Sequence, residues 1–350
     1  MLNSFSIGER VIGRGHPCFV IAEAGVNHNG SLDLARQLVD VAAEAGADAV
    51  KFQTFRADKL VTAGAKQAEY QARNTGRVES QAEMLRRLEL SESDHRAIMA
   101  HCRDRGVRFL STPFDHESAD FLDSEGMEAI KIPSGEVTNL PLVQHLAAKQ
   151  KPILLSTGMC TLADVEACVR TLEQAGIEKL AILHCVSCYP ADPAETNLRA
   201  MTTMAAAFGY PVGYSDHTLG NEVSLAAAAL GACVIEKHFT LDRSLPGPDH
   251  RASSEPTELK QLVTGIRMIE SALGTGRKVP TPSEAGTAAV ARRSLVTARP
   301  IPAGHVLRFD DLMARRPGTG LAPTMLPQIV GLTAREAIPE GTLLTLRMVS

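Results

Sequence analysis

Two histidines stand at the ends of short apolar stretches rich in β-branched residues: His217 directly follows 211–216, and His238 lies near the end of 232–239. If these stretches are adjacent parallel strands of a barrel, they end on the same face and the two imidazoles meet there. Imidazole is a common ligand of divalent metals, and nearby carboxylates such as Glu236 and Asp249 orient such ligands or a bound water. The segment therefore predicts a metal site, although histidines are also often ordinary polar residues.

A second set of residues combines cations with hydroxyls at the ends of other apolar stretches. Lys51 and Lys131 lie inside the apolar sequences VKF and IKI, and a buried lysine needs a partner. A bound anion supplies that partner, and hydroxyl groups suit the fixed geometry of phosphate oxygens. We therefore predict a site for a small phosphorylated anion, whose hydroxyls are Thr112, Ser134, Ser156 and Ser215.

Carboxylates accompany these groups and offer a general base or a group that orients a metal. Glu23 and Glu136 each end a predicted strand, and Asp249 follows the last one. Glu23 and Glu136 also fit structural ion pairs with Lys51 and Lys131. Since no Ser or Cys stands in a nucleophile-elbow context, covalent acyl chemistry is disfavoured.

The elements that must position these residues alternate along the chain. Helical periodicity separates eight apolar stretches, and polar side chains close each stretch. Eight βα units in succession predict a TIM barrel, (β/α)8, within the α/β class. An open doubly wound sheet is the alternative, which the lack of a GxGxxG motif after the first strand disfavours. The strands are expected at 18–24, 47–54, 107–115, 128–136, 151–159, 179–190, 211–216 and 232–239.

One connection is longer than the others. Residues 55–91 are polar, charged and poor in β-branched residues, which fits either a disordered insertion or a lid on the rim of the barrel. Asn74, at the centre of this segment, is a candidate ligand contact in the second case.

The composition changes after the barrel. Residues 276–288 are rich in Gly, Pro, Thr and Ser and predict a linker between a catalytic domain at 1–275 and a small β-rich domain at 289–350. Within the small domain, residues 298–312 and 334–349 resemble each other, which predicts an internal pseudo-repeat.

Composition excludes several classes of partner. The chain has 350 residues, a formal net charge of −4 and no Trp, so neither a basic surface for nucleic acid nor a base-stacking platform is expected. The seven cysteines show no paired metal-ligand spacing and read as free thiols of a reducing compartment. No apolar run reaches the length of a membrane span, so we expect no membrane partner and a cytoplasmic location.

Several motifs, in one order from about residue 16 to the end, are similar to those of the sialic acid synthases. ARRPGTGL at 314–321 resembles the motif of the antifreeze-like (SAF, β-clip) domain that ends these enzymes. The other matching motifs are AEAGVNHNG (22–30), VKFQTF (50–55), STPFD (111–115), IKIPSGE (130–136), LSTGM (155–159), LHCVSCYP (183–190), GYSDHTLG (213–220) and EKHFTLDRSLPGPDH (236–250).

The resemblance implies a metal-dependent condensation of phosphoenolpyruvate with an N-acylated hexosamine, typically N-acetylmannosamine, to give N-acetylneuraminic acid and phosphate. It also implies a domain-swapped homodimer and a Mn²⁺ or Mg²⁺ ion bound by His217 and His238. It implies that phosphoenolpyruvate is bound by Lys51, Thr112, Lys131, Ser134, Ser156, Ser187 and Ser215. It implies that the sugar is bound by Gln53, Asn74, Glu136, Tyr189, Asp249 and, from the neighbouring subunit, Arg316. Glu23, Glu136, Lys51 and Lys131 are the expected catalytic residues.

Two departures from the family bear on the sugar. The resemblance implies an amide at position 187 in neuraminate synthases and Ser or Thr in relatives that use bacterial diamino sugars, and this chain has Ser187. Arg292 and Arg293 stand where an aromatic contact is expected. The main expectation is an N-acetylneuraminate synthase. The alternative is a legionaminic acid synthase that uses 2,4-diacetamido-2,4,6-trideoxymannose.

Two further alternatives lie outside this reaction. One is a non-catalytic carbohydrate-binding protein, which would need neither the lysines nor the histidines. The other is a metal-dependent hydrolase, which usually has more ligands than the sequence offers.

Overall fold

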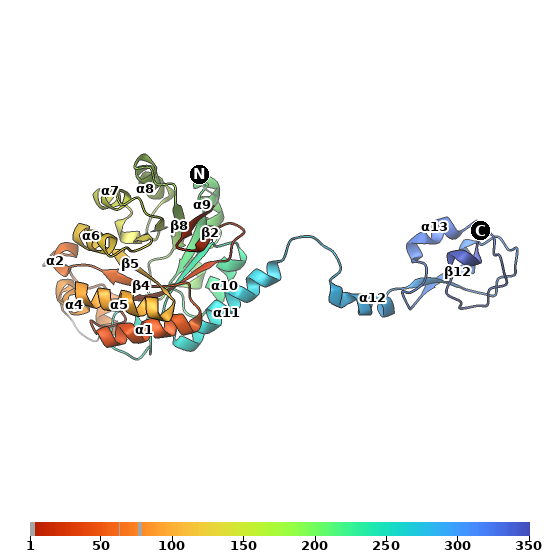
Figure 1. Cartoon of the computed structure of the whole chain (residues 1–350), viewed down its shortest axis with the longest axis horizontal. Helices are drawn as coiled ribbons and strands as arrows, with labels where there is room; N and C mark the ends of the chain where they lie inside the picture. The colour runs from red at the N-terminus through yellow and green to blue at the C-terminus, as the bar shows by residue number, and fades with distance from the viewer. Residues whose placement is uncertain (1–3, 63, 76–78) are drawn as a thin grey trace. The chain divides into compact units, whose positions relative to one another are not determined.

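Eight parallel strands form one sheet in the larger part of the chain, and the computed structural model describes residues 4–62, 64–75 and 79–350 (Figure 1). The strands are β3 (Phe19–Gly25), β4 (Ala49–Thr54), β5 (Arg108–Pro113), β6 (Ile130–Ile132), β7 (Ile153–Ser156), β8 (Leu180–Cys185), β9 (Val212–Asp216) and β10 (Val234–His238). They pair in the order β5-β4-β3-β10-β9-β8-β7-β6, and β5 also contacts β6. The sheet is therefore a nearly closed barrel, which confirms the predicted (β/α)8 fold.

A helix follows each strand and covers the outside of the barrel (Figure 1). The first of them shows why these segments are helical. Ser31 caps its N-terminus, Leu38 and Val39 are buried on its inner face, and Gly46 ends it in a left-handed conformation. The helices are α1 (Leu32–Ala45), α5 (Glu92–Arg105), α6 (His116–Ser124), α7 (Leu140–Ala147), α8 (Leu162–Gln174), α9 (Ala200–Phe208), α10 (Glu222–Ala229) and α11 (Pro256–Leu273).

A short hairpin that the sequence analysis did not predict precedes the barrel. Its strands, β1 (Ser4–Ile7) and β2 (Arg10–Gly13), pair antiparallel. Phe5, Ile7 and Ile12 are buried in one apolar cluster with barrel residues that include Phe19 and Leu154. The hairpin therefore adds to the apolar core inside the barrel. Its strands have only four residues each, which is too short for a detectable periodic pattern in the sequence.

The described residues of the insertion at 55–91 form three helices, α2 (Ala57–Leu60), α3 (Glu69–Thr75) and α4 (Gln81–Leu88). A capping box between Ser80 and Glu83 fixes the start of α4. Met84 and Leu88 on α4 are buried against Phe55 and Val26. In its described residues the insertion is therefore a folded segment that packs on the barrel.

The chain divides into two structural units, the first ending at Gly274 and the second beginning at Thr275. The second unit contains α12 (Ala285–Ala291), β11 (Ser294–Thr297), β12 (Leu312–Arg315) and α13 (Leu326–Ile329). Helix α12 starts inside the segment predicted as a linker, 276–288. Nine residues form an apolar core of this unit, namely Leu295, Ile301, Leu307, Leu312, Ile329, Ala334, Ile338, Leu344 and Val349.

The predicted pseudo-repeat corresponds to a paired arrangement in the second unit. Ile301 and Ile338 occupy equivalent positions of the two copies, and each donates a 2.8 Å backbone hydrogen bond to the other. Gly304 and Gly341, three residues later, both adopt positive φ, at 78° and 73°. The two copies therefore build similar turns around a shared contact.

Among the described residues, no helix combines the length and the apolar character needed to cross a membrane.

Candidate active site

A cavity of about 470 Å³ opens at the carboxyl ends of the barrel strands. Its lining residues come from all eight strands or the loops that follow them, and from the insertion. The predicted site residues that line it are Glu23, Lys51, Gln53, Thr112, Lys131, Ser134, Ser156, Ser187, Tyr189, Ser215, His217 and His238. The structure thus brings together most of the side chains that the sequence analysis selected.

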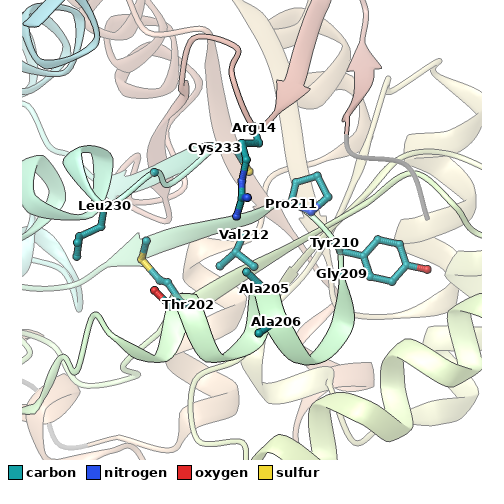
Figure 2. Close-up of a pocket in the computed structure, with 12 residues that line it drawn as sticks. Arg14, Thr202, Ala205, Ala206, Gly209, Tyr210, Pro211, Val212, Leu230 and Cys233 are labelled. Atoms are coloured by element: carbon teal, nitrogen blue, oxygen red, sulfur yellow. The ribbon is translucent and has the colours of Figure 1, made fainter. Parts of the chain in front are cut away.

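A second cavity, of about 560 Å³, lies toward the other ends of the strands (Figure 2). It is lined by one face of α9, by residues that precede β9 and β10, and by Arg14 and Cys233. Its described lining contains no carboxylate and no histidine. Of these two cavities, the smaller is therefore the candidate active site, because carboxylates, histidines and lysines converge in its described lining.

Lys51 is buried at the end of β4 between a carboxylate and a hydroxyl. Its Nζ lies 2.7 Å from Oε2 of Glu23 and donates a 2.9 Å hydrogen bond to Oγ1 of Thr112. Glu23 and Lys51 are register partners on β3 and β4, so the strand pairing itself places them side by side. This ion pair was the alternative that the sequence analysis left open for Glu23.

Lys131, on β6, pairs across the barrel with Glu236 on β10. Its Nζ donates hydrogen bonds of 2.8 and 3.0 Å to the two carboxylate oxygens. Ser215 donates a 3.0 Å hydrogen bond to the same carboxylate, and Lys51 lies 3.7 Å from it. Glu236 is therefore the anion that links the two lysines within the protein.

Burial shifts the acid–base properties of this cluster in different directions. Burial raises the pKa of Glu23 to about 7, and the nearby Lys51 opposes this shift only in part. Burial also acts to raise the pKa of Glu236, but Lys131 and Lys51 outweigh it and hold that pKa at about 2. Burial lowers the pKa of Lys131, whereas for Lys51 the charges of Glu23 and Glu236 outweigh burial and raise the pKa. The cluster thus holds one firmly ionised carboxylate and one that is easily protonated.

His217 and His238 face each other, with ring centroids 5.4 Å apart, and Tyr189 lies against both rings. Nδ1 of His217 donates a 2.7 Å hydrogen bond to the carbonyl of Val186, which leaves the lone pair at Nε2. Nδ1 of His238 is buried and has no hydrogen-bond partner within the described part of the chain. Burial, followed by the charge of His217, lowers the pKa of His238 well below its ordinary value. His238 is therefore neutral at neutral pH.

This donor set fits a divalent metal. A metal-bound histidine usually donates its other ring N–H to a backbone carbonyl or carboxylate, as His217 does here to Val186. In the part of the chain that the structure describes, no third His, Cys, Asp or Glu joins the pair in a metal-binding cluster. Two protein ligands suit an ion that keeps water or substrate in its remaining positions, and they do not suit a three-ligand hydrolase site.

The hydroxyl groups of the site fall into two classes. Ser134 is engaged, because its Oγ accepts a 2.8 Å hydrogen bond from the amide of Gly158. Ser156 is buried and its Oγ has no hydrogen-bond partner among the residues that the structure describes. Ser187 lies so close to Gly158 that a Cβ at position 158 would meet its Oγ at 2.2 Å. Gly158 thus allows the loop after β7 to approach Ser134 and Ser187 closely.

Four predicted site residues do not line this cavity. Glu136 is half-buried and accepts a 2.7 Å hydrogen bond from Asn139. Asn74 donates a 2.7 Å hydrogen bond to the carbonyl of Pro248. Asp249 is buried, and burial raises its pKa to about 6 against the opposing charge of His217. Arg316 belongs to the second unit, where its Nε donates a 3.0 Å hydrogen bond to the carbonyl of Ala291.

The sequence analysis missed several lining residues. Glu236 was assigned to the histidines, although it pairs with Lys131; its place at the start of the EKH motif was the available signal. Cys185 lies 3.7 Å from Nδ1 of His217 and received no role. Gln71 and Gln81 line the cavity from the insertion, and no sequence signal distinguished them from its other polar residues.

Comparison with known proteins places this geometry in context. The NeuB family matches residues 38–278, and the SAF domain matches residues 292–350. The N,N'-diacetyllegionaminic acid synthase of Legionella pneumophila is 49% identical over 336 residues, which cover 95% of this chain and 94% of that protein. The enzyme of the same name from Campylobacter jejuni is 46% identical over 327 residues, covering 93% of this chain and 98% of that protein.

Among solved structures, the N-acetylneuraminic acid (sialic acid) synthetase of Leptospira borgpetersenii in complex with citrate superposes with a TM-score of 0.72 at 33% identity. The match covers 81% of this chain and 94% of that one. The NeuB match falls within the barrel unit and the first residues after it, and the SAF match falls within the second unit. The chain belongs to the NeuB family, that of the sialic and legionaminic acid synthases, and ends in a SAF domain.

Proposed function

We propose that the protein is an N,N'-diacetyllegionaminic acid synthase. The observation that carries this proposal is the identity of 49% and 46% to two synthases of that name, over more than nine-tenths of this chain in both cases. The match to the sialic acid synthetase structure is weaker, at 33%. The main expectation from the sequence, an N-acetylneuraminate synthase, is therefore less well supported than its alternative.

The proposed reaction joins phosphoenolpyruvate to 2,4-diacetamido-2,4,6-trideoxymannose in its open-chain form. Carbon 3 of phosphoenolpyruvate forms a bond to the aldehyde carbon, and the aldehyde oxygen takes up a proton. Water adds to carbon 2 and loses a proton, and the tetrahedral intermediate then expels phosphate by breaking the C–O bond. The products are N,N'-diacetyllegionaminic acid and phosphate, so the reaction needs no redox partner.

We assign the charged end of the cavity to phosphoenolpyruvate. Lys51 and Lys131 would neutralise its phosphate and carboxylate, and their present partners Glu23 and Glu236 hold both ammonium groups in place before the substrate binds. The Oγ of Ser156, which has no hydrogen-bond partner in the described ranges of the chain, is available to donate a hydrogen bond to the anion. Thr112, Ser134, Ser187 and Ser215 complete the proposed set. Positioning and fixed charge would supply most of the acceleration.

Glu23 is our candidate for the base that takes the proton from water. It lines the cavity, and its pKa of about 7 allows it to accept a proton in one step and release it in the next. Glu136 was the other candidate, but it does not line the cavity. We therefore propose Glu23 as the base, with Lys51 and Lys131 as the other catalytic residues.

We propose that His217 and His238 hold a divalent ion, Mn²⁺ or Mg²⁺. Such an ion would act as a Lewis acid toward the sugar aldehyde. The chain's own part is to keep the two imidazoles oriented, which His217 achieves through the carbonyl of Val186. Tyr189, packed on both rings, restricts water at this point.

We propose that Gln53 and Tyr189 contact the rest of the sugar. Asn74, Glu136 and Asp249 would be outer contacts, and Arg316 would come from a neighbouring subunit. The second unit has ten Lys or Arg residues but only five Asp or Glu, although the whole chain is acidic. This opposite charge supports the proposed domain-swapped homodimer, because a basic unit is attracted to the acidic barrel of another copy.

The test is phosphate release from phosphoenolpyruvate with 2,4-diacetamido-2,4,6-trideoxymannose, with N-acetylmannosamine and without sugar. We expect kcat/KM for the diacetamido sugar to exceed that for N-acetylmannosamine by at least about tenfold. EDTA should abolish release, and added Mn²⁺ or Mg²⁺ should restore it. A preference for N-acetylmannosamine would instead identify an N-acetylneuraminate synthase. Sugar-dependent phosphate release that EDTA does not affect would show that the proposed metal ion is wrong.

A further inference from the structure

Two glutamines of the insertion line the cavity and have no role in the mechanism above. Gln71 lies on α3 and Gln81 is the first residue of α4. Among the described residues the insertion contributes one further lining residue, Ala68, so this described part of the wall carries amides and a methyl group but no charge. The strands contribute the lysines and carboxylates. The cavity therefore has a charged end within the barrel and a neutral end at the insertion.

The barrel holds this neutral end in place. Met84 and Leu88 anchor α4 in the apolar cluster with Phe55 and Val26. The backbone amide of Gln81 donates a 3.1 Å hydrogen bond to the carbonyl of Ala65. Asn74 ties α3 to the loop after β10 through the carbonyl of Pro248. Both glutamines therefore start from positions that the fold determines.

Their side-chain amides are available to a ligand. Oε1 of Gln71 accepts a 3.0 Å hydrogen bond from the amide of Ala68, which orients the group and leaves its NH₂ without a partner among the described residues. The carboxamide of Gln81 makes no hydrogen bond to the described part of the chain. Gln67 behaves differently, because its Oε1 accepts a bond from the amide of Glu79 and it does not line the cavity.

We infer that Gln71 and Gln81 recognise the second acetamido group, at carbon 4, of a 2,4-diacetamido sugar. An acetamido group presents a carbonyl acceptor, an N–H donor and a methyl group. Gln71 offers donors to the carbonyl, Gln81 offers an acceptor to the N–H, and Ala68, Phe114 and Met159 offer apolar surface to the methyl group. This inference rests on the proposed function and names the residues that determine its sugar specificity.

N-acetylmannosamine cannot make these contacts in the same way. It carries a hydroxyl at carbon 4, which is shorter than an acetamido group and has no carbonyl to accept from Gln71. A site built to hydrogen-bond one group discriminates against an analogue that lacks it, because the site's own polar groups then remain unpaired. The two amides should therefore contribute to the preference between the sugars and contribute little to phosphoenolpyruvate binding.

The experiment compares kcat/KM for the two sugars in wild type, Gln71→Ala, Gln81→Ala and the control Gln67→Ala, all in the full chain with Mn²⁺ present. In each cavity variant, we expect kcat/KM for the diacetamido sugar divided by kcat/KM for N-acetylmannosamine to fall by about tenfold, the effect of losing one hydrogen bond to substrate. Gln67→Ala belongs to the same insertion but does not face the cavity. It should leave the ratio unchanged, even if it weakens the insertion and lowers both values.

The outcomes separate the inference from the proposed function. If wild type prefers the diacetamido sugar but Gln71→Ala and Gln81→Ala keep the same ratio, the recognition role is wrong while the proposed function stands. If wild type prefers N-acetylmannosamine, both are wrong. If Gln67→Ala changes the ratio as much as the cavity variants, the effect comes from the fold of the insertion, and the assignment to these amides is overturned.

Discussion

Lys237 and Asp216 are register partners on β10 and β9, and each directly precedes one of the two cavity histidines. Nζ of Lys237 lies 2.8 Å from Oδ2 of Asp216, and both side chains are buried. Asp216 also accepts hydrogen bonds from Ser224 and from the amide and hydroxyl of Thr218. Because the pair locks the two strands together one residue before the imidazoles, it helps to set the spacing between His217 and His238.

Breaking this pair should destabilise the barrel strongly. Lys237→Met leaves Asp216 as a buried carboxylate without its cation, which typically costs about 3–5 kcal/mol. Urea unfolding followed by circular dichroism measures the loss. The control is Arg170→Met, which removes the exposed ion pair with Glu166 and should cost less than about 1 kcal/mol. Equal losses of unfolding free energy in the two variants would show that the buried pair stabilises the protein no more than an exposed pair does.

Removing one imidazole should stop turnover without unfolding the protein. Under the proposed metal assignment, His238→Ala leaves only one protein ligand, His217, so we expect Mn²⁺ binding and phosphate release to fall to background. The free energy of unfolding should change by no more than about 1 kcal/mol, since the side chain faces the cavity rather than the apolar core. Mn²⁺ electron paramagnetic resonance and an unfolding curve test both points.

The matched control is His101→Ala, because His101 pairs with Asp40 on the outer helices and should keep both metal binding and activity. Normal turnover by metal-stripped His238→Ala would overturn the metal assignment.

Activity should fall on the acid side of neutrality. A general base works only when deprotonated, and the pKa of Glu23 is raised to about 7 by burial. The active form is therefore present above pH 7, and kcat/KM should decrease by about tenfold per pH unit below it. Glu23→Gln should remove most of the activity. A profile of kcat/KM from pH 5 to 9 supplies the measurement.

Asp249 has a raised pKa of about 6 and is the group most easily confused with Glu23. In Asp249→Asn, the decrease in kcat/KM should still begin near pH 7. If this variant shifts the pH at which kcat/KM decreases, Asp249 and not Glu23 is the titrating base.

The second unit should act on the sugar and not on phosphoenolpyruvate. Arg316→Ala is expected to raise KM for the sugar by about tenfold, the worth of one charge-assisted hydrogen bond, and to change KM for phosphoenolpyruvate less than twofold. Steady-state kinetics with each substrate varied in turn test this. Arg315→Ala is the neighbouring control with the same charge change. Equal effects on both substrates, or equal effects of the two variants, would argue against a sugar contact at Arg316.

Much of the barrel followed from local sequence patterns. Seven of the eight predicted strand ranges contain the observed strand, and β3 extends one residue beyond the range 18–24, because buried β-branched runs and capped amphipathic helices are local signals of about ten to fifteen residues. The hairpin Ser4–Ile7 and Arg10–Gly13 lacked such a signal. Burial of Lys51 and Lys131 was also predictable, since the neighbours of each lysine are apolar and the strand that carries them is expected to be buried.

The sequence by itself determined the order of elements, the end of the barrel where the polar groups gather, and the residue types available there. Only the tertiary structure decided which carboxylate meets which cation. Glu236 reaches Lys131 across the barrel and Glu23 meets Lys51 through strand register, whereas Glu136, though it follows Lys131 closely in the chain, does not line the cavity. The physical reason is that periodicity is a local property. Partnership inside a closed barrel depends instead on register and curvature between strands that are far apart in sequence.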